Sequence, residues 1–104
     1  GRFRNEGPMA HGLPVSLGRT AVLARGDLRI VVTESCQSVN DPAWCRLHGV
    51  DLGEVDLFLV KAKNHFRASF EPLCGAMIEI ESPGPAPGDL RRVPYKYVPR
   101  AYLL

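Results

Sequence analysis

Short motifs that carry catalysis or bind metal by themselves are missing from this sequence. Neither the C-x-x-C nor the H-E-x-x-H spacing occurs, and there is no G-x-S-x-G turn, so neither a local zinc site nor a serine hydrolase is indicated. Cys45 and His48 lie one helical turn apart but supply only two ligands. The stretch 12–20 differs from a phosphate loop because five residues separate its glycines and strand-forming residues follow. We therefore predict no catalytic and no metal-ligating residue in this chain.

Long apolar runs, a framework of cysteines and a strong net charge are also lacking. The longest apolar stretch, Val55–Val60, is interrupted by Asp56 and is far shorter than the roughly 20 residues of a membrane-spanning helix. Three cysteines without close spacing do not form a disulfide framework, so we expect reduced thiols, a cytoplasmic location and no membrane segment. Residue 1 is Gly rather than Met and no secretory signal follows, so we expect a fragment of a longer protein.

The residues that are present fit one small globular domain over residues 1–104. A chain of 104 residues, 45% of them hydrophobic, supplies one core but not two. Glycine and proline predict an N-terminal loop over residues 1–18. A Pro-rich loop and a basic tail are predicted over residues 82–104.

The first half of the chain predicts a hairpin and a helix. Strand-forming runs flank Gly26-Asp27, which is typical of a β-hairpin whose turn needs a positive φ. Asp41 before Pro42 predicts the start of a helix that carries Trp44 and Leu47 on one face. A glycine at position 49 is expected to end that helix.

The second half predicts two more strands and a second helix. Residues 55–61 are almost continuously apolar, which favours a buried strand in the middle of a sheet, and Met77–Glu81 alternates like a half-buried strand. A helix is expected from Asn64, with a kink at Pro72. Together these segments predict an α/β fold with a mixed β-sheet, a β-hairpin and about two helices in a single domain.

A cluster of polar residues after the predicted buried strand is the candidate binding site. Ligand sites of α/β proteins lie where strands end, and Lys63, Asn64, His65 and Arg67 follow the strand directly. Arg67 can bind a carboxylate through two parallel hydrogen bonds, and His65 can donate or accept near neutral pH. The same residues also fit a solvated helix start. If they do bind, one reading is a stand-alone module for small anions at Lys63, His65 and Arg67.

The C-terminal tail offers a second alternative. Residues 91–104 carry four cations (Arg91, Arg92, Lys96, Arg100) and no acid, among three tyrosines. That pattern permits a nucleic-acid-binding adaptor, through phosphate contacts and base stacking. Four cations are few, however, and the net charge of +2 gives no extended basic face. We therefore expect no nucleic-acid partner, and a tail packed along the domain through its tyrosines.

Several blocks of the sequence, in their order, carry a family resemblance. They are Gly7-Pro-Met, Leu17-Gly-Arg-Thr-Ala-Val-Leu, Ile30-Val-Val-Thr-Glu, Leu59-Val-Lys, His65-Phe-Arg-Ala-Ser-Phe-Glu-Pro, Pro83-Gly, Asp89-Leu and Pro94-Tyr. With these blocks the chain resembles the C-terminal domain of the MlrC-like metallopeptidases, the microcystin-degrading family. The resemblance covers nearly the whole chain, and the block that begins at His65 is its most specific part.

The resemblance implies a zinc hydrolase that acts on peptide or small amide bonds, in which the metal lowers the pKa of a bound water. In that family the zinc ligands belong to a larger N-terminal catalytic domain, which would be the partner of this chain. The expected contribution of this chain is to cover one side of the cleft. Lys63, Asn64, His65 and Arg67 would then face the substrate, with the Gly7–Gly18 loop nearby, and the isolated chain would be inactive.

Overall fold

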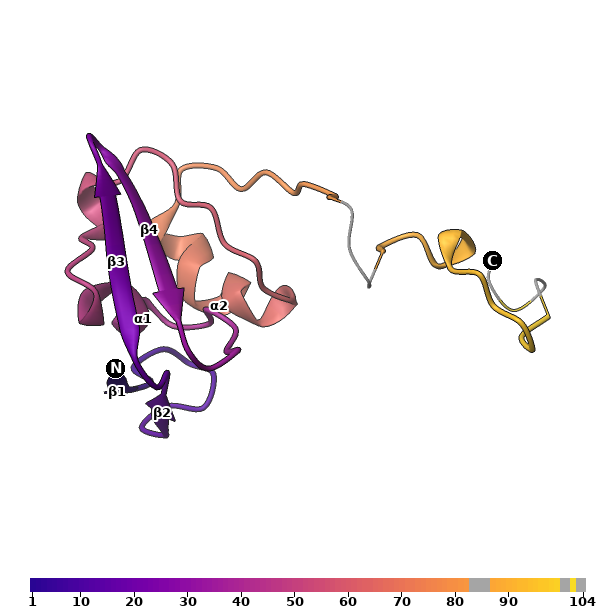
Figure 1. The fold of residues 1–104 in the computed structure, drawn as a ribbon, viewed down its shortest axis with the longest axis horizontal. Coiled ribbons are helices and arrows are strands. Elements are labelled where there is room, and N and C mark those ends of the chain that lie inside the picture. The colour runs from indigo at the N-terminus through magenta and orange to yellow at the C-terminus, as the bar shows by residue number, and fades with distance from the viewer. Residues whose placement is uncertain (83–86, 100–101, 103–104) are drawn as a thin grey trace.

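The computed structural model describes residues 1–82, 87–99 and 102. Four strands and two short α-helices make up its regular structure (Figure 1): β1 (Arg2–Arg4), β2 (Pro14–Ser16), β3 (Thr20–Arg25), β4 (Leu28–Thr33), α1 (Pro42–Leu47) and α2 (Arg67–Phe70). Four single 3₁₀ turns complete it, at Leu52–Glu54, Asn64–Phe66, Glu71–Leu73 and Leu90–Arg92. The predicted α/β class, with a hairpin and two helices in one domain, is confirmed.

The two shortest strands lie inside the segment predicted as an N-terminal loop. β1 and β2 form an antiparallel pair in which Phe3 lies opposite Val15. Proline is tolerated at Pro14 because the pair has only two strands and both are edges. The loop between the strands is closed by backbone hydrogen bonds between Asn5 and Leu13 and between Gly12 and Asn5.

The β3–β4 hairpin forms as the sequence predicts. Its register pairs Leu23 with Ile30 and Val22 with Val31 across a two-residue turn. Gly26 in that turn has φ +56°, a left-handed conformation that glycine adopts without steric cost. Because opposite residues of an antiparallel pair share a face, Leu23 and Ile30 project together, and both are about half exposed.

Helix α1 begins and ends where the sequence predicts. The Asp41 side chain caps it by accepting a hydrogen bond from the Ala43 amide (2.8 Å), and Gly49 follows the last turn with φ +69°. The expected apolar face is only half correct, because Trp44 is 8% exposed whereas Leu47 is 37% exposed. The helix has six residues and therefore buries a single turn.

The strands predicted at residues 55–61 and 77–81 do not form. Strands occur only in the pairs β1–β2 and β3–β4 within the described ranges, so there is no central strand. Leu57 and Leu59 are 72% and 71% exposed, and Ile78 and Ile80 are 82% and 72% exposed. Both segments are rich in strand-forming residues, but a strand needs a neighbour to hydrogen-bond with, and in the described part of the chain neither segment has one.

The second helix is shorter than predicted. α2 has four residues, preceded by a 3₁₀ turn that starts at Asn64 and followed by one that contains Pro72. Proline lacks the amide that would continue the helix, so the chain tightens into the 3₁₀ turn there.

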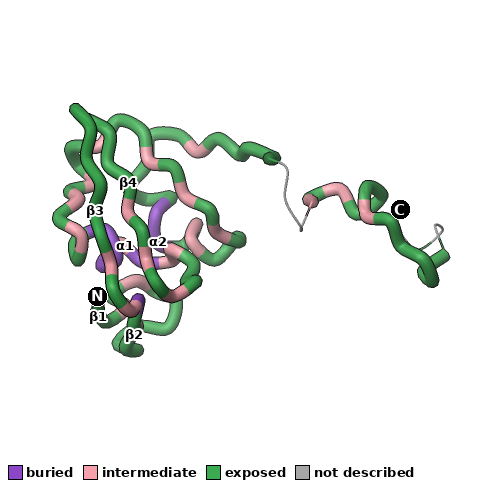
Figure 2. Tube along the Cα trace, in the orientation of Figure 1, coloured by how far each residue is buried: buried purple, intermediate pink, exposed green. Residues whose placement is uncertain are grey.

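The core is small and is formed by both helices and the end of β2. Its buried apolar residues are Leu17, Ala43, Trp44, Cys45 and Phe70. Figure 2 shows that buried residues gather around α1 and α2, whereas the outer strands are mostly exposed. The Phe58 ring stacks on Phe70 with centroids 5.5 Å apart, which fixes one residue of the 55–61 segment on the core.

The C-terminal tail differs from expectation. Residues 87–99 extend away from the rest of the domain (Figure 1), and Tyr97 and Tyr102 are 94% and 79% exposed. The prediction that the tail packs along the domain through its tyrosines is therefore wrong for these two residues. Part of the predicted Pro-rich loop (residues 83–86) and Arg100 of the tail lie outside the described residues.

Across the described part of the chain, no helix has the length and apolar content needed to cross a membrane.

Candidate functional site

The predicted site residues lie together on the turn that leads into α2. Lys63 is the residue before the 3₁₀ turn Asn64–Phe66, and the side chains of Lys63, Asn64 and His65 are exposed. None of the three makes a side-chain hydrogen bond to any residue that the structure describes. Three neighbouring side chains are therefore exposed and have no hydrogen-bond partner among the described residues.

Arg67 is the fourth predicted residue, and its guanidinium is already engaged. Its Nη2 pairs with Glu79 Oε1, and its Nη1 lies 3.7 Å from the sulfur of Met77. The guanidinium carbon also lies 5.9 Å from the centre of the Phe66 ring, within cation–π range. The side chain is 34% exposed, so the protein orients this cation while leaving part of it open to solvent.

The candidate site does not lie at the edge of a sheet, where the sequence predicts it. Residues 55–61 form no strand, so the site lies between two extended segments rather than at the end of a sheet. A helix of four residues also has too small a dipole to attract an anion strongly. An anion bound here would therefore be held by the side chains of Arg67, Lys63 and His65.

The loop after β1 holds α2 in place. A Cβ on Gly7 would overlap Ser69 Oγ, so glycine is needed for this close approach. The buried Asp41 carboxylate fixes the same loop by accepting hydrogen bonds from the amides of Glu6 (2.9 Å) and Gly7 (2.7 Å). The Gly7 end of the Gly7–Gly18 loop therefore packs against Ser69 of α2, and its nearness to Lys63, Asn64, His65 and Arg67 stays a prediction.

Sequence reasoning missed Glu79, the carboxylate that pairs with Arg67. Glu79 lies in the stretch Met77–Glu81, whose alternating pattern predicts a half-buried strand. Charged residues on the solvent face of such a strand are common and do not by themselves indicate a site. The alternating pattern could have indicated this contact. It places Met77 and Glu79 on the same face of an extended segment, and both residues contact Arg67.

No group of three or more histidine, cysteine or acidic side chains that can hold a metal is present among the described residues. The side chains that the structure describes therefore do not fit a zinc site. Burial raises the pKa of the Cys45 thiol to about 11, which disfavours the thiolate that a metal needs. The Nδ1 of His48 lies 2.8 Å from the carbonyl oxygen of Trp44.

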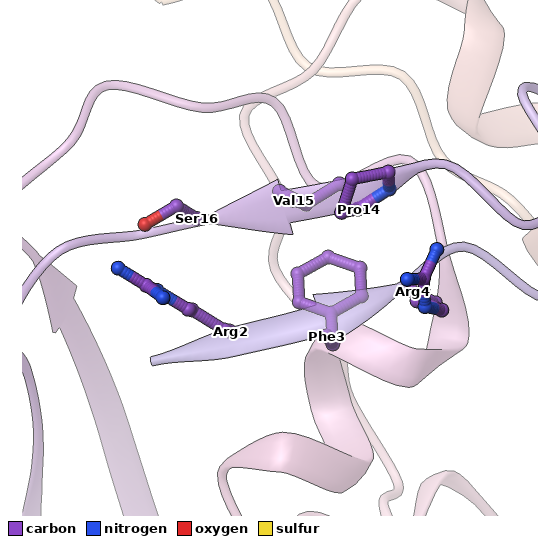
Figure 3. A pocket seen from close by; sticks show the side chains of 6 residues that line it. All are labelled: Arg2, Phe3, Arg4, Pro14, Val15 and Ser16. Carbon is purple, nitrogen blue, oxygen red and sulfur yellow. The ribbon is translucent and has the colours of Figure 1, made fainter.

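A surface hollow lies at the β1–β2 pair and not at the candidate site. Its walls are formed by Arg2, Phe3, Arg4, Pro14, Val15 and Ser16, and Figure 3 shows the Phe3 ring between the two arginines. Arg4 Nη1 donates to the carbonyl oxygen of Gly12 at 2.8 Å, so this arginine closes the loop between the strands. None of the predicted site residues lines this hollow.

The basic tail is partly neutralised. Arg91 donates to Asp89 from Nε (2.8 Å), and Arg92 Nη1 lies 2.8 Å from Glu81. The hydrogen bonds with Arg91 hold the pKa of Asp89 below its ordinary value, and the same contact raises the pKa of Arg91. Two of the four tail cations thus already have acidic partners, which weakens the nucleic-acid alternative.

The features above define a small α/β domain with an oriented arginine, exposed polar neighbours and no metal ligands gathered in its described part. The chain belongs to the family described as MlrC C-terminus, whose model matches residues 1–97. No curated protein and no solved structure matches the chain.

Proposed function

We propose that this domain covers one side of the active-site cleft of a zinc-dependent peptidase or amidohydrolase and presents substrate-binding side chains to it. The zinc is held by an N-terminal catalytic domain of the same protein, and the substrate is a peptide or a small amide. Membership of the MlrC C-terminus family supports this proposal. Since the residues in the described part of the chain do not fit a metal site, the role of this domain is binding and positioning, and alone it is inactive.

The observation that carries the proposal is the pair of extended segments on either side of the candidate site. Between Asp56 and Ala62, and between Gly75 and Ser82, the backbone makes no hydrogen bond to any described residue. Both segments expose large apolar side chains: Leu57, Leu59, Ile78 and Ile80. Adjacent exposed apolar side chains with unpaired backbone are typical of a surface that another domain covers.

The candidate site adjoins both segments. The first segment leads directly into Lys63, and the second carries Glu79, the partner of Arg67. A catalytic domain docked on the segments would therefore have His65 and Arg67 at the rim of the interface. This placement suits side chains that hold a substrate but take no part in the bond cleavage.

The three cysteines are free thiols, with Cys45 buried and Cys36 and Cys74 exposed. Reduced thiols suit a reducing compartment, so a cytoplasmic location is part of the proposal.

Replacing His65 and Arg67 by alanine in the full-length protein tests the substrate-binding role. The loss of a charged hydrogen bond to substrate is expected to lower kcat/KM about tenfold or more, with zinc content unchanged. The matched control is Arg46→Ala, which removes another arginine that forms an ion pair, in this case with Glu6. Equal turnover in the double variant and the control would refute the role.

A further inference from the structure

We propose that Arg67 is a carboxylate-binding site and that Glu79 occupies it as an internal competitor until a substrate carboxylate displaces it. This inference deepens the proposed function, because it names the chemical class that the site recognises: a peptide that carries a carboxylate. It also assigns Glu79 a role in regulating access to the site.

The two partners are held very differently. Arg67 belongs to α2 and is fixed by the Phe66 ring and the Met77 sulfur, with only 34% of its side chain exposed. Glu79 is 76% exposed and belongs to the extended segment, whose backbone has no hydrogen-bond partner in the described part of the chain. The cation is therefore preorganised, whereas the carboxylate can move away at little cost.

Glu79 uses only one of the two Nη atoms that Arg67 can offer to a carboxylate. Nη2 of Arg67 pairs with a single oxygen, Oε1 of Glu79, while Nη1 faces the weakly accepting sulfur of Met77. An incoming carboxylate that accepts from both Nη atoms would form the fork geometry that arginine favours. Lys63 and His65, exposed on the preceding turn, add positive or donor groups near the same place.

The strength of the internal pair sets the expected effect. In an exposed ion pair the paired state is about 1.4 to 5 times as populated as the unpaired state. Competition from Glu79 therefore weakens the binding of an external carboxylate about two- to sixfold. Removing the Glu79 charge should restore that factor. The matched control is Glu81, two residues further along, whose charge pairs with Arg92 instead.

The test is an NMR titration of the 104-residue chain, with the side-chain NH signals of arginine as the readout. The probes are N-acetylalanine for a main-chain carboxylate and the α-amide of N-acetylglutamate for a side-chain carboxylate, with the α-amide of N-acetylalanine as the neutral control. We expect Glu79→Gln to bind at least one acidic probe about two- to sixfold more tightly than the unmodified chain. Glu81→Gln should bind as the unmodified chain does.

Arg67→Lys keeps the charge but loses the fork, and it is expected to abolish the difference between the Glu79 forms. The inference would be overturned if Glu79→Gln bound the acidic probes as the unmodified chain does, or if Glu79→Gln tightened binding by the same factor in the Arg67→Lys background as in the presence of Arg67. Because the titration needs neither zinc nor turnover, such a result leaves the cleft-covering proposal to its own test in the full-length protein. Conversely, normal turnover in the double variant of His65 and Arg67, together with tighter probe binding in Glu79→Gln, would refute the binding of substrate at this site but leave the carboxylate site at Arg67 and its competition with Glu79 standing.

Discussion

Replacing Asp41 by alanine should destabilise the domain more than any other single change on its surface or in its loops. The carboxylate is 2% exposed and accepts hydrogen bonds from three amides: Glu6 at 2.9 Å, Gly7 at 2.7 Å and Ala43 at 2.8 Å. It thereby caps α1 and ties the first loop to the core in one step. Without it, the buried Ala43 amide and the partly buried amides of Glu6 and Gly7 lose their hydrogen-bond acceptor.

The magnitude follows from those three contacts. Hydrogen bonds to a charged group contribute about 1.5–3 kcal/mol each, and the loss of an N-cap alone costs about 1 kcal/mol. Since the contacts share one carboxylate and are not additive, we expect Asp41→Ala to lower the free energy of unfolding by about 3–5 kcal/mol. That is a large part of the roughly 5–15 kcal/mol that stabilises a domain of ordinary size.

Urea unfolding followed by Trp44 fluorescence measures this loss. Trp44 is the only tryptophan, and it is buried in α1 next to the cap. Asp51→Ala is the matched control, because Asp51 is exposed and accepts from one amide only, that of Gly53 at 2.9 Å, so its removal should cost about 1 kcal/mol or less. If Asp41→Ala costs no more than Asp51→Ala, the role of Asp41 in joining the loop to the helix is wrong.

The packing and the charges lead to four further predictions. Gly7→Ala should lower the free energy of unfolding by about 1–3 kcal/mol because its Cβ overlaps Ser69 Oγ, whereas Gly75→Ala, with open space around the position, should change it by less than about 0.5 kcal/mol; urea unfolding of both variants decides this. Cys45 should resist iodoacetamide at pH 8 while Cys36 and Cys74 react, as mass spectrometry of the labelled chain would show. Burial raises the pKa of the folded-state Cys45 thiol to about 11, so the thiol is neutral in the folded protein well above the pH at which it ionises in the unfolded chain. The free energy of unfolding should therefore fall by about 2–3 kcal/mol between pH 9 and 11. Cys45→Ala should abolish this fall. Hydrogen bonds from the backbone amide of Arg19 and, second, from its guanidinium lower the pKa of Glu34, so an NMR titration should find Glu34 ionising below the ordinary range of glutamate. Arg19→Ala keeps the amide and removes the guanidinium, so it should move the pKa only part of the way back.

Local signals in the sequence were reliable wherever a short segment decides its own conformation. The Gly26-Asp27 turn and the Asp41-Pro42 helix start depend on a few neighbouring residues, and both form as predicted. The polar cluster from Lys63 to Arg67 is likewise gathered on one turn because its residues are neighbours in the sequence.

The sequence does not predict in the same way which segments of the backbone lie side by side. The apolar run at 55–61 has the composition of a buried strand, yet composition does not say which backbone lies beside it. In this chain the run stacks Phe58 on the core and leaves Leu57 and Leu59 in solvent. For the same reason the contact between Arg67 and Glu79, twelve residues apart, could not be read from the sequence. If the missing neighbour belongs to another domain, the strand pattern and the exposed side chains have one explanation.

Hydrogen–deuterium exchange tests that account most directly. The amides of residues 56–62 and 75–82 should exchange rapidly in the 104-residue chain, because they have no hydrogen-bond partner among its described residues. In the full-length protein the account predicts strong protection of both segments, since the catalytic domain would cover them, while the β3–β4 hairpin turn exchanges equally in both forms. Rapid exchange of both segments in the full-length protein would contradict the proposal that this domain works docked against a catalytic partner.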